Sequence, residues 1–421
     1  MLRWVDARAA GPQRWGRWLF VAFLLAEVAL IALTRLTAAA PNGGDLCRDF
    51  VDAQRLLHGQ DPYAPFASCG DLHHSPHPPL ALLLVVPLAW LPIGAAAFVW
   101  DLLMLAALGG ALWLVWDELR PQVDPRWVAV GLAVILVWTP LQDTWLEAQI
   151  GPLVLLLLVL AWRARRHGQA ALAGGWLAVA TLIRVYPVLL FAYPLLRREW
   201  RLARGGVIVG GVITLVTLPL FGVPSYLRYL FVEAPGASAE WVNDAHNVAW
   251  RGWLGSVFVG SNTIHPLLAA AGVVGPLFGS GVVVALAALL WRGWNARAAV
   301  LGTVKDDAVW LLGIPVMLLV SPLAWPHYFT VLLLPWLVVL ADAARARRMT
   351  PSAWLVVAAV TLTEVHALGL RVLLPLPRLL PWPAGVFVFM LPFYALLLSF
   401  FAVWCAVGQE SGEIPKVLRE K

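Results

Sequence analysis

Residues 18–36 read WLFVAFLLAEVALIALTRL, a run that is almost wholly apolar. A helix that crosses a bilayer needs about 20 such residues. Comparable runs recur along the 421-residue chain, in which 61% of residues are hydrophobic and 13% are charged. A soluble domain carries about 25% charged residues, and the mean hydropathy here is +0.78. The sequence therefore predicts an all-α, polytopic membrane protein that forms one integral membrane domain over residues 1–421.

The other apolar runs give the expected number of crossings. Residues 78–116 are counted as one crossing preceded by a half-helix, with the break at Leu91-Pro92-Ile93-Gly94. The remaining runs are 127–139, 152–162, 170–183, 186–196, 207–220, 266–290, 308–320, 329–341, 353–370 and 386–407. We therefore predict about twelve membrane helices. If residues 78–116 crossed twice, the orientation of everything downstream would be reversed.

The basic residues indicate the orientation. The net charge is +6, but the arginines form short clusters at 163–166, 197–204 and 345–348 between apolar runs, with no extended basic patch for nucleic acid. Short basic loops stay in the cytoplasm. Both tails are then cytoplasmic, while the polar segments 37–77 and 221–265 form two outer loops. The basic start before residue 18 fits a retained first helix better than a cleaved signal peptide, and we expect a plasma (inner) membrane location.

The three cysteines leave one question open. Cys47 and Cys69 lie in the first predicted outer loop and Cys405 lies in the last apolar run. In an oxidising compartment the first two can form a disulfide or remain two free thiols, because sequence does not give the required geometry. No cysteine and histidine spacing typical of a metal site occurs, nor does a glycine-rich nucleotide-binding motif. We expect no metal and no cofactor.

The first outer loop carries the leading catalytic candidates. Apolar residues at helical spacing predict a short amphipathic helix over 45–58, ended by Gly59 and the turn at Asp61-Pro62. Asp45 and Asp49 are four residues apart and so share a helix face. Near a membrane surface, such a carboxylate can act as general base toward a hydroxyl group. The alternative is that Asp45 caps the helix and both carboxylates are merely solvated.

Other isolated polar residues are candidates for binding. Arg184 stands alone between two apolar runs and suits a phosphate, or it extends to the interface. His327 lies among Trp325, Pro326 and Tyr328 at a helix break, either as a phosphate or sugar ligand or as a bystander in an aromatic belt. In the second outer loop the candidates are His246, Asn247 and Arg251, because amides, arginine and aromatic residues are used to recognise sugars; ordered loops share that composition.

Read together, these segments resemble glycosyltransferase family 87, the polyprenyl-phosphate-mannose-dependent mannosyltransferases. Residues 45–63 are similar to the family's first outer loop, which ends Leu-Leu-x-Gly-x-Asp-Pro-Tyr, and 77–80 (HPPL) resemble its Tyr-Pro-Pro-Leu. Residues 148–150 (AQI) lie where the family has Gly-Gln-Val, and 173–174 with 183–187 (IRVYP) are similar to Ala-Gly followed by Lys-x-x-Pro. Residues 321–328 resemble Ser-Pro with Trp-x-His-His, with Tyr328 in place of the second His, and 247–249 partly match Asn-Gln-Ser.

This resemblance implies a GT-C fold with its active site on the outer face. It implies transfer of a sugar, by default mannose, from a polyprenyl phosphate to a glycolipid or lipoglycan, with inversion and without a metal. Asp45 matches the family's catalytic Asp, with Asp49 as the second candidate. Arg184 and His327 would hold the donor phosphate, and Gln149, His246, Asn247 and Arg251 would contact sugar or acceptor.

Two other classes of protein compete with the enzyme. A transporter or flippase for a lipid-linked sugar would also carry charged residues and broken helices in the membrane, but its polar residues would gather near the midplane rather than on one side, and no inverted repeat is evident. A membrane scaffold would not need an isolated arginine such as Arg184. The donor could also carry arabinose or another pentose.

Overall fold

The computed structural model describes residues 12–37, 44–64, 74–75, 77–119, 125–261, 265–373 and 384–408. All regular structure in these ranges is helical, which confirms the predicted all-α class. Six helices in the described part are long and apolar enough to cross a membrane, or seven if one bent pair is a single span. Four shorter apolar helices accompany them. The count of about twelve crossings stays a prediction.

The N-terminal half is built around α4 (Ile93–Leu119), which packs against α1 (Pro12–Thr37) and α7 (Gly151–Arg166). Before α4 come the short α3 (Pro79–Val85) and η1 (Val86–Leu88), so residues 78–116 form the predicted half-helix plus one long helix. A bent pair follows α4, made of α5 (Pro125–Val137) and α6 (Thr139–Leu146), with an angle of 47° between its two helices. The bend brings the polar residues after α6 to one end of the bundle.

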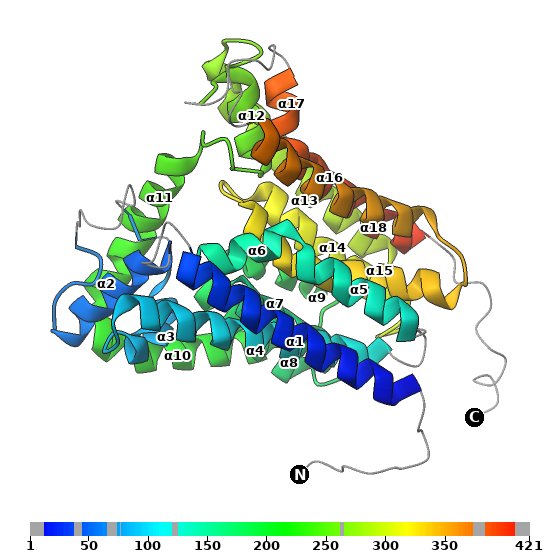
Figure 1. Ribbon diagram of the computed structural model, residues 1–421, viewed down its shortest axis with the longest axis horizontal. Helices are drawn as coiled ribbons and strands as arrows, with labels where there is room; N and C mark the ends of the chain where they lie inside the picture. The colour runs from blue at the N-terminus through cyan, green and yellow to red at the C-terminus, as the bar shows by residue number, and fades with distance from the viewer. Residues whose placement is uncertain are drawn as a thin grey trace.

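The C-terminal half packs against this unit (Figure 1). Its helices are η5 (Ala271–Val273), α13 (Val274–Asn295), α14 (Val304–Val320), η6 (Pro326–Leu332), α15 (Leu333–Arg345), α16 (Pro351–Leu373), α17 (Ala384–Phe389) and α18 (Leu391–Gly408). Helix α14 is buried over nearly its whole length, between α13 and α18. Helix α1 begins and α18 ends on the same side of the molecule, at the right in Figure 1, which agrees with an even number of crossings.

Between the halves, α8 (Ala170–Ile183) lies directly against α10 (Trp200–Arg228), and η3 (Tyr186–Phe191) with α9 (Ala192–Leu196) connects the two. Glycine permits this approach, since a Cβ added at Gly174 would lie 1.9 Å from the carbonyl oxygen of Leu202. Small residues at such positions let membrane helices pack closely. The Ala173-Gly174 pair therefore serves helix packing, and Arg184 follows at the far end of α8.

An ion-pair network closes one end of the bundle, which we call the arginine end. Arg165 on α7 pairs with Asp306 on α14 at 2.7 Å and with Glu199 at 2.7 Å, and Arg197 also pairs with both acids. Asp306 is fully buried, and it also accepts a hydrogen bond from the Tyr193 hydroxyl group. Neighbouring pairs join Arg163 to Asp117, Arg166 to Glu118 and to Asp307, and His167 to Glu118. The arginines of the first cluster, and Arg197 of the second, are thus paired with acids of other segments.

The predicted second outer loop, residues 221–265, is mostly helical. Helix α10 continues past residue 220, although Gly222 interrupts it with φ +73°, and a π-helical turn, η4 (Tyr229–Glu233), leads into α11 (Ala234–Trp241) and then α12 (Trp250–Phe258). Glu233 accepts a hydrogen bond from the backbone of Ser75 at 3.1 Å and pairs with His74 at 3.3 Å. The outer part of α10 is therefore tied to the first predicted loop.

Candidate active site

The site forms at the end of the bundle opposite the arginine end, where α2 (Leu46–Leu57) lies. Asp45 immediately precedes this helix, as the periodicity predicts, but its side chain makes no capping hydrogen bond. The capping role considered for Asp45 is therefore wrong. Gly44 has φ +53°, a conformation that favours glycine, and a Cβ there would lie 2.3 Å from a Glu147 carboxylate oxygen. The turn thus places Asp45 beside the segment that follows α6.

A chain of side-chain hydrogen bonds leaves Asp45. Gln149 donates from Nε2 to Asp45 Oδ2 at 2.5 Å and accepts at Oε1 from the Arg184 guanidinium at 3.1 Å. Arg184 also donates to the Tyr328 hydroxyl group at 2.9 Å, and its Cζ lies 4.8 Å from the centre of that ring. One connected group therefore joins four residues from distant parts of the sequence: Asp45, Gln149, Arg184 and Tyr328. Its members are a carboxylate, an amide, a guanidinium and a phenol.

The backbone around residue 148 aims Gln149 at this group. Ala148 has φ +48°, which an L residue adopts only at a cost. The Ala148 carbonyl oxygen accepts a hydrogen bond from the Trp100 indole at 2.8 Å. The backbone amide of Gln149 donates to the Thr144 carbonyl oxygen at 2.9 Å. These contacts hold the turn between α6 and α7. The turn explains why the family motif has glycine at this position.

Two histidines complete the surroundings. His77 Nδ1 lies 2.7 Å from Asp49 Oδ2, at ion-pair distance. His327 lies in η6, its ring 4.9 Å from the Tyr328 ring. Both residues are buried, at 4% and 6% relative exposure. Among the described residues, the Nε2 atoms of both rings and Oδ1 of Asp49 have no hydrogen-bond partner, and buried polar atoms of this kind mark where a ligand or water belongs.

The electrostatics of Asp45 suit a base. Burial raises the pKa of Asp45, while His77, the hydrogen bond from Gln149 and the charge of Arg184 oppose this rise. A carboxylate with a raised pKa binds a proton more strongly and is the better acceptor from a hydroxyl group. Asp45 is partly accessible to solvent, whereas Asp49 is buried beside His77. Asp45 is thus the carboxylate that an incoming molecule can reach.

Glu147 was missed by sequence reasoning. Burial, followed by the charges of Asp45 and Asp143, raises its pKa to about 7. It shares a short polar segment with Asp143, and no motif singles it out. It makes the surroundings of Asp45 acidic on one side, while Arg184 makes them basic on the other.

The three candidates of the second outer loop are placed differently. The Asn247 amide donates to the carbonyl oxygens of Val242 and Pro322 and accepts from the amides of Ala249 and Ala324. Since these partners occupy the whole amide group, Asn247 anchors the loop and has no group left for the predicted sugar contact.

His246 and Arg251 lie outside the hydrogen-bonded chain. His246 pairs with Asp244 at 3.0 Å and stacks on Trp325 with ring centres 6.1 Å apart. The hydrogen bond that His246 donates to the Asp244 carboxylate raises the pKa of His246, and the nearby charges of Asp143 and Glu147 raise it further. Arg251 donates to Asn243 at 3.3 Å. His246 therefore borders the acidic side of the site, and Arg251 supports the loop.

Cys47, on α2, is disulfide-bonded, and Cys405 is free. Cys69, its candidate partner by sequence, lies outside the described residues. A disulfide next to the site end fits an oxidising compartment.

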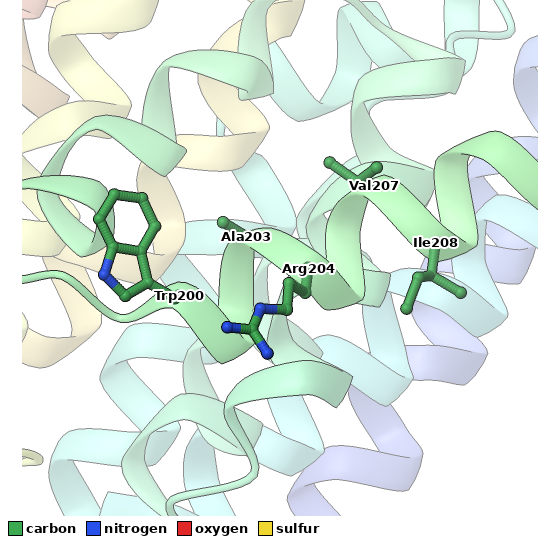
Figure 2. A pocket seen from close by; sticks show the side chains of 5 residues that line it. All are labelled: Trp200, Ala203, Arg204, Val207 and Ile208. Atoms are coloured by element: carbon green, nitrogen blue, oxygen red, sulfur yellow. The ribbon is translucent and has the colours of Figure 1, made fainter.

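A surface hollow lies elsewhere, on the first turns of α10. It is lined by Trp200, Ala203, Arg204, Val207 and Ile208 (Figure 2). It adjoins the end of α8 remote from Arg184, and it carries none of the candidate side chains. Within the described residues, no group of three or more His, Cys, Asp or Glu side chains could hold a metal ion.

Comparison with known proteins gives the class. A profile of glycosyltransferase family 87 matches residues 76–322, more than half of the chain. The chain belongs to this family, and it is a membrane glycosyltransferase of the kind that uses polyprenol-phosphate-linked sugars.

Three relatives show the reactions named for similar proteins. A polyprenol-phosphate-mannose-dependent alpha-(1-2)-phosphatidylinositol pentamannoside mannosyltransferase of Mycolicibacterium smegmatis is 26% identical over 75% of this chain and 74% of its own. Its namesake in Mycobacterium tuberculosis is 30% identical over 66% and 62%. An alpha-(1->3)-arabinofuranosyltransferase of Mycobacterium tuberculosis is 25% identical over 47% of each chain.

Proposed function

We propose that the protein transfers mannose from a polyprenyl-phosphate donor to a hydroxyl group of a glycolipid, on the outer face of the plasma membrane, with Asp45 as general base. The observation that carries the proposal is the chain Asp45–Gln149–Arg184. It places a proton acceptor and a cation in one group, joined by a single amide. That is the pair of charges required when a hydroxyl group displaces a phosphate from a sugar.

The reaction follows from this arrangement. Asp45 takes the proton of the acceptor hydroxyl group as its oxygen attacks C1 of the sugar. The bond between C1 and the phosphate oxygen breaks, and its electron pair leaves with the polyprenyl phosphate. Arg184 stabilises the negative charge that develops there. Attack from the face opposite the leaving phosphate inverts C1, so Asp45 and Arg184 lie on opposite sides of the sugar.

The distribution of charge supports the direction of binding. Glu147 and Asp143 neighbour Asp45 on the side that His246 borders, and an anion would be repelled there. A neutral sugar with several hydroxyl groups fits that side and can stack on Trp325 or Trp241, whose rings meet edge to face. We assign the acceptor to this side and the donor phosphate to the side of Arg184.

The outer location rests on two supports. The arginine clusters gather at the opposite end of the bundle from Asp45, and such clusters stay in the cytoplasm. Cys47 is disulfide-bonded at the site end, as expected outside the cytoplasm. Donors carried on a lipid also serve where nucleotide sugars are absent. The inositol-mannoside acceptors named for the relatives make a mannosylated glycolipid the first acceptor to test.

The decisive test is transfer of radiolabelled mannose from polyprenyl-phosphate-mannose to endogenous lipid, in membranes with equal amounts of wild type or variant. Asp45→Asn should abolish transfer. Asp61→Asn is the matched control, because Asp61 is exposed on the same outer segment and an asparagine oxygen can still accept from the Tyr63 backbone amide, which lies 3.0 Å from Asp61 Oδ1. The other contact of Asp61 is a partly exposed ion pair with Arg228 at 3.2 Å. Transfer by Asp45→Asn at the wild-type rate would remove Asp45 from the chemistry and point to Asp49. No transfer by the wild type would reject the mannose donor, and a pentose donor or lipid transport would be tested next.

A further inference from the structure

We propose that His77 is a ligand of the donor phosphate, acting with Arg184 and His327 as the third side chain of one anion pocket. The proposal rests on the proposed function, because it names a further residue for the same donor. In the sequence, His77 begins the segment 77–80 (HPPL), which resembles the family's Tyr-Pro-Pro-Leu. His77 is not a member of the hydrogen-bonded chain that runs from Asp45 to Tyr328.

The first argument is the unused hydrogen-bonding capacity of His77. The side chain is buried, and neither ring nitrogen has a hydrogen-bond partner among the described residues. Nδ1 lies 2.7 Å from an Asp49 carboxylate oxygen, at ion-pair distance, and the Tyr63 hydroxyl group donates to the His77 carbonyl oxygen at 3.2 Å. With its backbone held by Tyr63 and Nδ1 turned toward Asp49, the ring presents Nε2 in a defined place. Burying that nitrogen without a partner costs free energy unless a bound molecule supplies one.

The second argument is that His327 has the same unused capacity in the same place. Its Nε2 atom is also buried and unpartnered in the described part of the chain. His77 is near enough to His327 and to Asp45 for its charge to influence both residues electrostatically. The charge of Arg184 influences the same two residues. The three nitrogen-bearing side chains come from separate segments: the turn before α3, η6 and the end of α8. Their convergence is a property of the fold and not of one local motif.

The third argument decides which part of the substrates fits. The Arg184 guanidinium supplies several N–H donors, His327 supplies one, and His77, whose Nδ1 faces Asp49, donates from Nε2 in its protonated form. A phosphate offers several charged acceptor oxygens at once. A sugar hydroxyl group would satisfy only one of these donors. The pocket therefore suits the phosphate diester of the donor and, after transfer, the phosphate monoester of the released polyprenyl phosphate.

The test is binding, which separates this role from catalysis. The purified, full-length protein in detergent would be titrated with farnesyl phosphate, and with farnesol as the same chain without phosphate. Wild type should prefer farnesyl phosphate. His77→Gln and His327→Gln should each weaken farnesyl phosphate binding by about tenfold or more, the usual effect of losing a hydrogen bond to a charged group. Binding of farnesol should not change.

His58→Gln is the matched control. His58 belongs to the same loop but is exposed, and its Nδ1 lies 2.7 Å from the Gln54 carbonyl oxygen. His77→Phe gives a second variant that fills the space without any donor, and size-exclusion elution with thermal unfolding would show that each variant is folded. If folded His77→Gln and His77→Phe bind farnesyl phosphate as tightly as His58→Gln does, the role of His77 is refuted while the proposed function stands. If wild type itself shows no preference for the phosphate, the polyprenyl-phosphate donor is refuted, and the pocket with it.

Discussion

Gln149 offers the most informative single change, because it touches both the base and the cation. Gln149→Leu keeps the approximate volume of the side chain and removes both hydrogen bonds, at 2.5 Å to Asp45 and at 3.1 Å to Arg184. Hydrogen bonds to charged groups contribute about 1.5–3 kcal/mol each. Only the part that is stronger in the transition state affects the rate. We expect a loss of about 2–3 kcal/mol, which is roughly a hundredfold decrease in kcat.

The pH dependence divides this loss into two parts. The hydrogen bond from Gln149 lowers the pKa of Asp45, so in the variant the carboxyl group holds its proton to higher pH. A base works only when deprotonated. Part of the lost rate should therefore return as the pH rises, and the remainder, which comes from misplacing Asp45 against Arg184, should persist at every pH.

The assay is the initial rate of mannose transfer, measured across pH with saturating polyprenyl-phosphate-mannose. Gln54→Leu is the control, because Gln54 makes one side-chain contact, to the carbonyl oxygen of Ala89 at 3.3 Å, and should keep wild-type activity. Gln149→Leu with a rate within threefold of wild type, in membranes where Asp45→Asn is inactive, would refute the idea that the amide aligns the two charges.

Three further predictions concern charge and backbone. Glu147→Gln removes an acid whose pKa burial and the charge of Asp45 raise to about 7, so a change in transfer rate that follows this titration near neutral pH should disappear, while the acidic limb set by Asp45 should stay in place; a displaced acidic limb would contradict this. Ala148→Gly should relieve the φ of +48° and raise the free energy of unfolding by about 0.5–1 kcal/mol with transfer intact, as thermal unfolding would show; a lower unfolding temperature contradicts this. Asp306→Asn leaves Arg165 and Arg197 with less buried countercharge and should cost about 3–5 kcal/mol, seen as a lower unfolding temperature in detergent, whereas an unchanged temperature would show that the network adds nothing.

Much of the fold could be predicted because apolar runs and their interruptions are local features. The run at 170–183 coincides with α8, which ends just before Arg184, and the run at 186–196 coincides with η3 and α9. The prediction failed after residue 220. Glycine and proline at 222 and 224 indicated the end of a helix, and Gly222 does leave helical geometry, yet the chain resumes its helix because Arg228 and Glu233 find partners on the first outer segment. No local pattern contains that information.

The site was predictable only where polar residues stand out from apolar surroundings. Arg184 and His327 were selected in this way, whereas Asp45 was selected by its helical spacing to Asp49 and by the family resemblance, and Gln149 by that resemblance alone. The structure brings the four residues together. Asn247 was selected on its residue type, but an amide that anchors a loop looks the same in sequence as one that binds sugar. Glu147 reaches Asp45 through the close approach of the Gly44 backbone, a contact between distant segments.

The network at the arginine end has a mechanical consequence. A long isoprenoid chain and a large glycolipid both have to reach Asp45, so the helices must part and close again in each cycle. Arg165, Arg197, Glu199 and Asp306 lock α7, α9 and α14 together at the far end, where separating them would strand several charges. At the end that holds Asp45, the segments are joined by single hydrogen bonds, and some buried polar atoms have no partner in the described part of the chain. Separating the helices there should cost much less free energy. We expect the helices to separate and close at the end that holds Asp45, around the sugar. The arginine end should stay closed and act as the hinge.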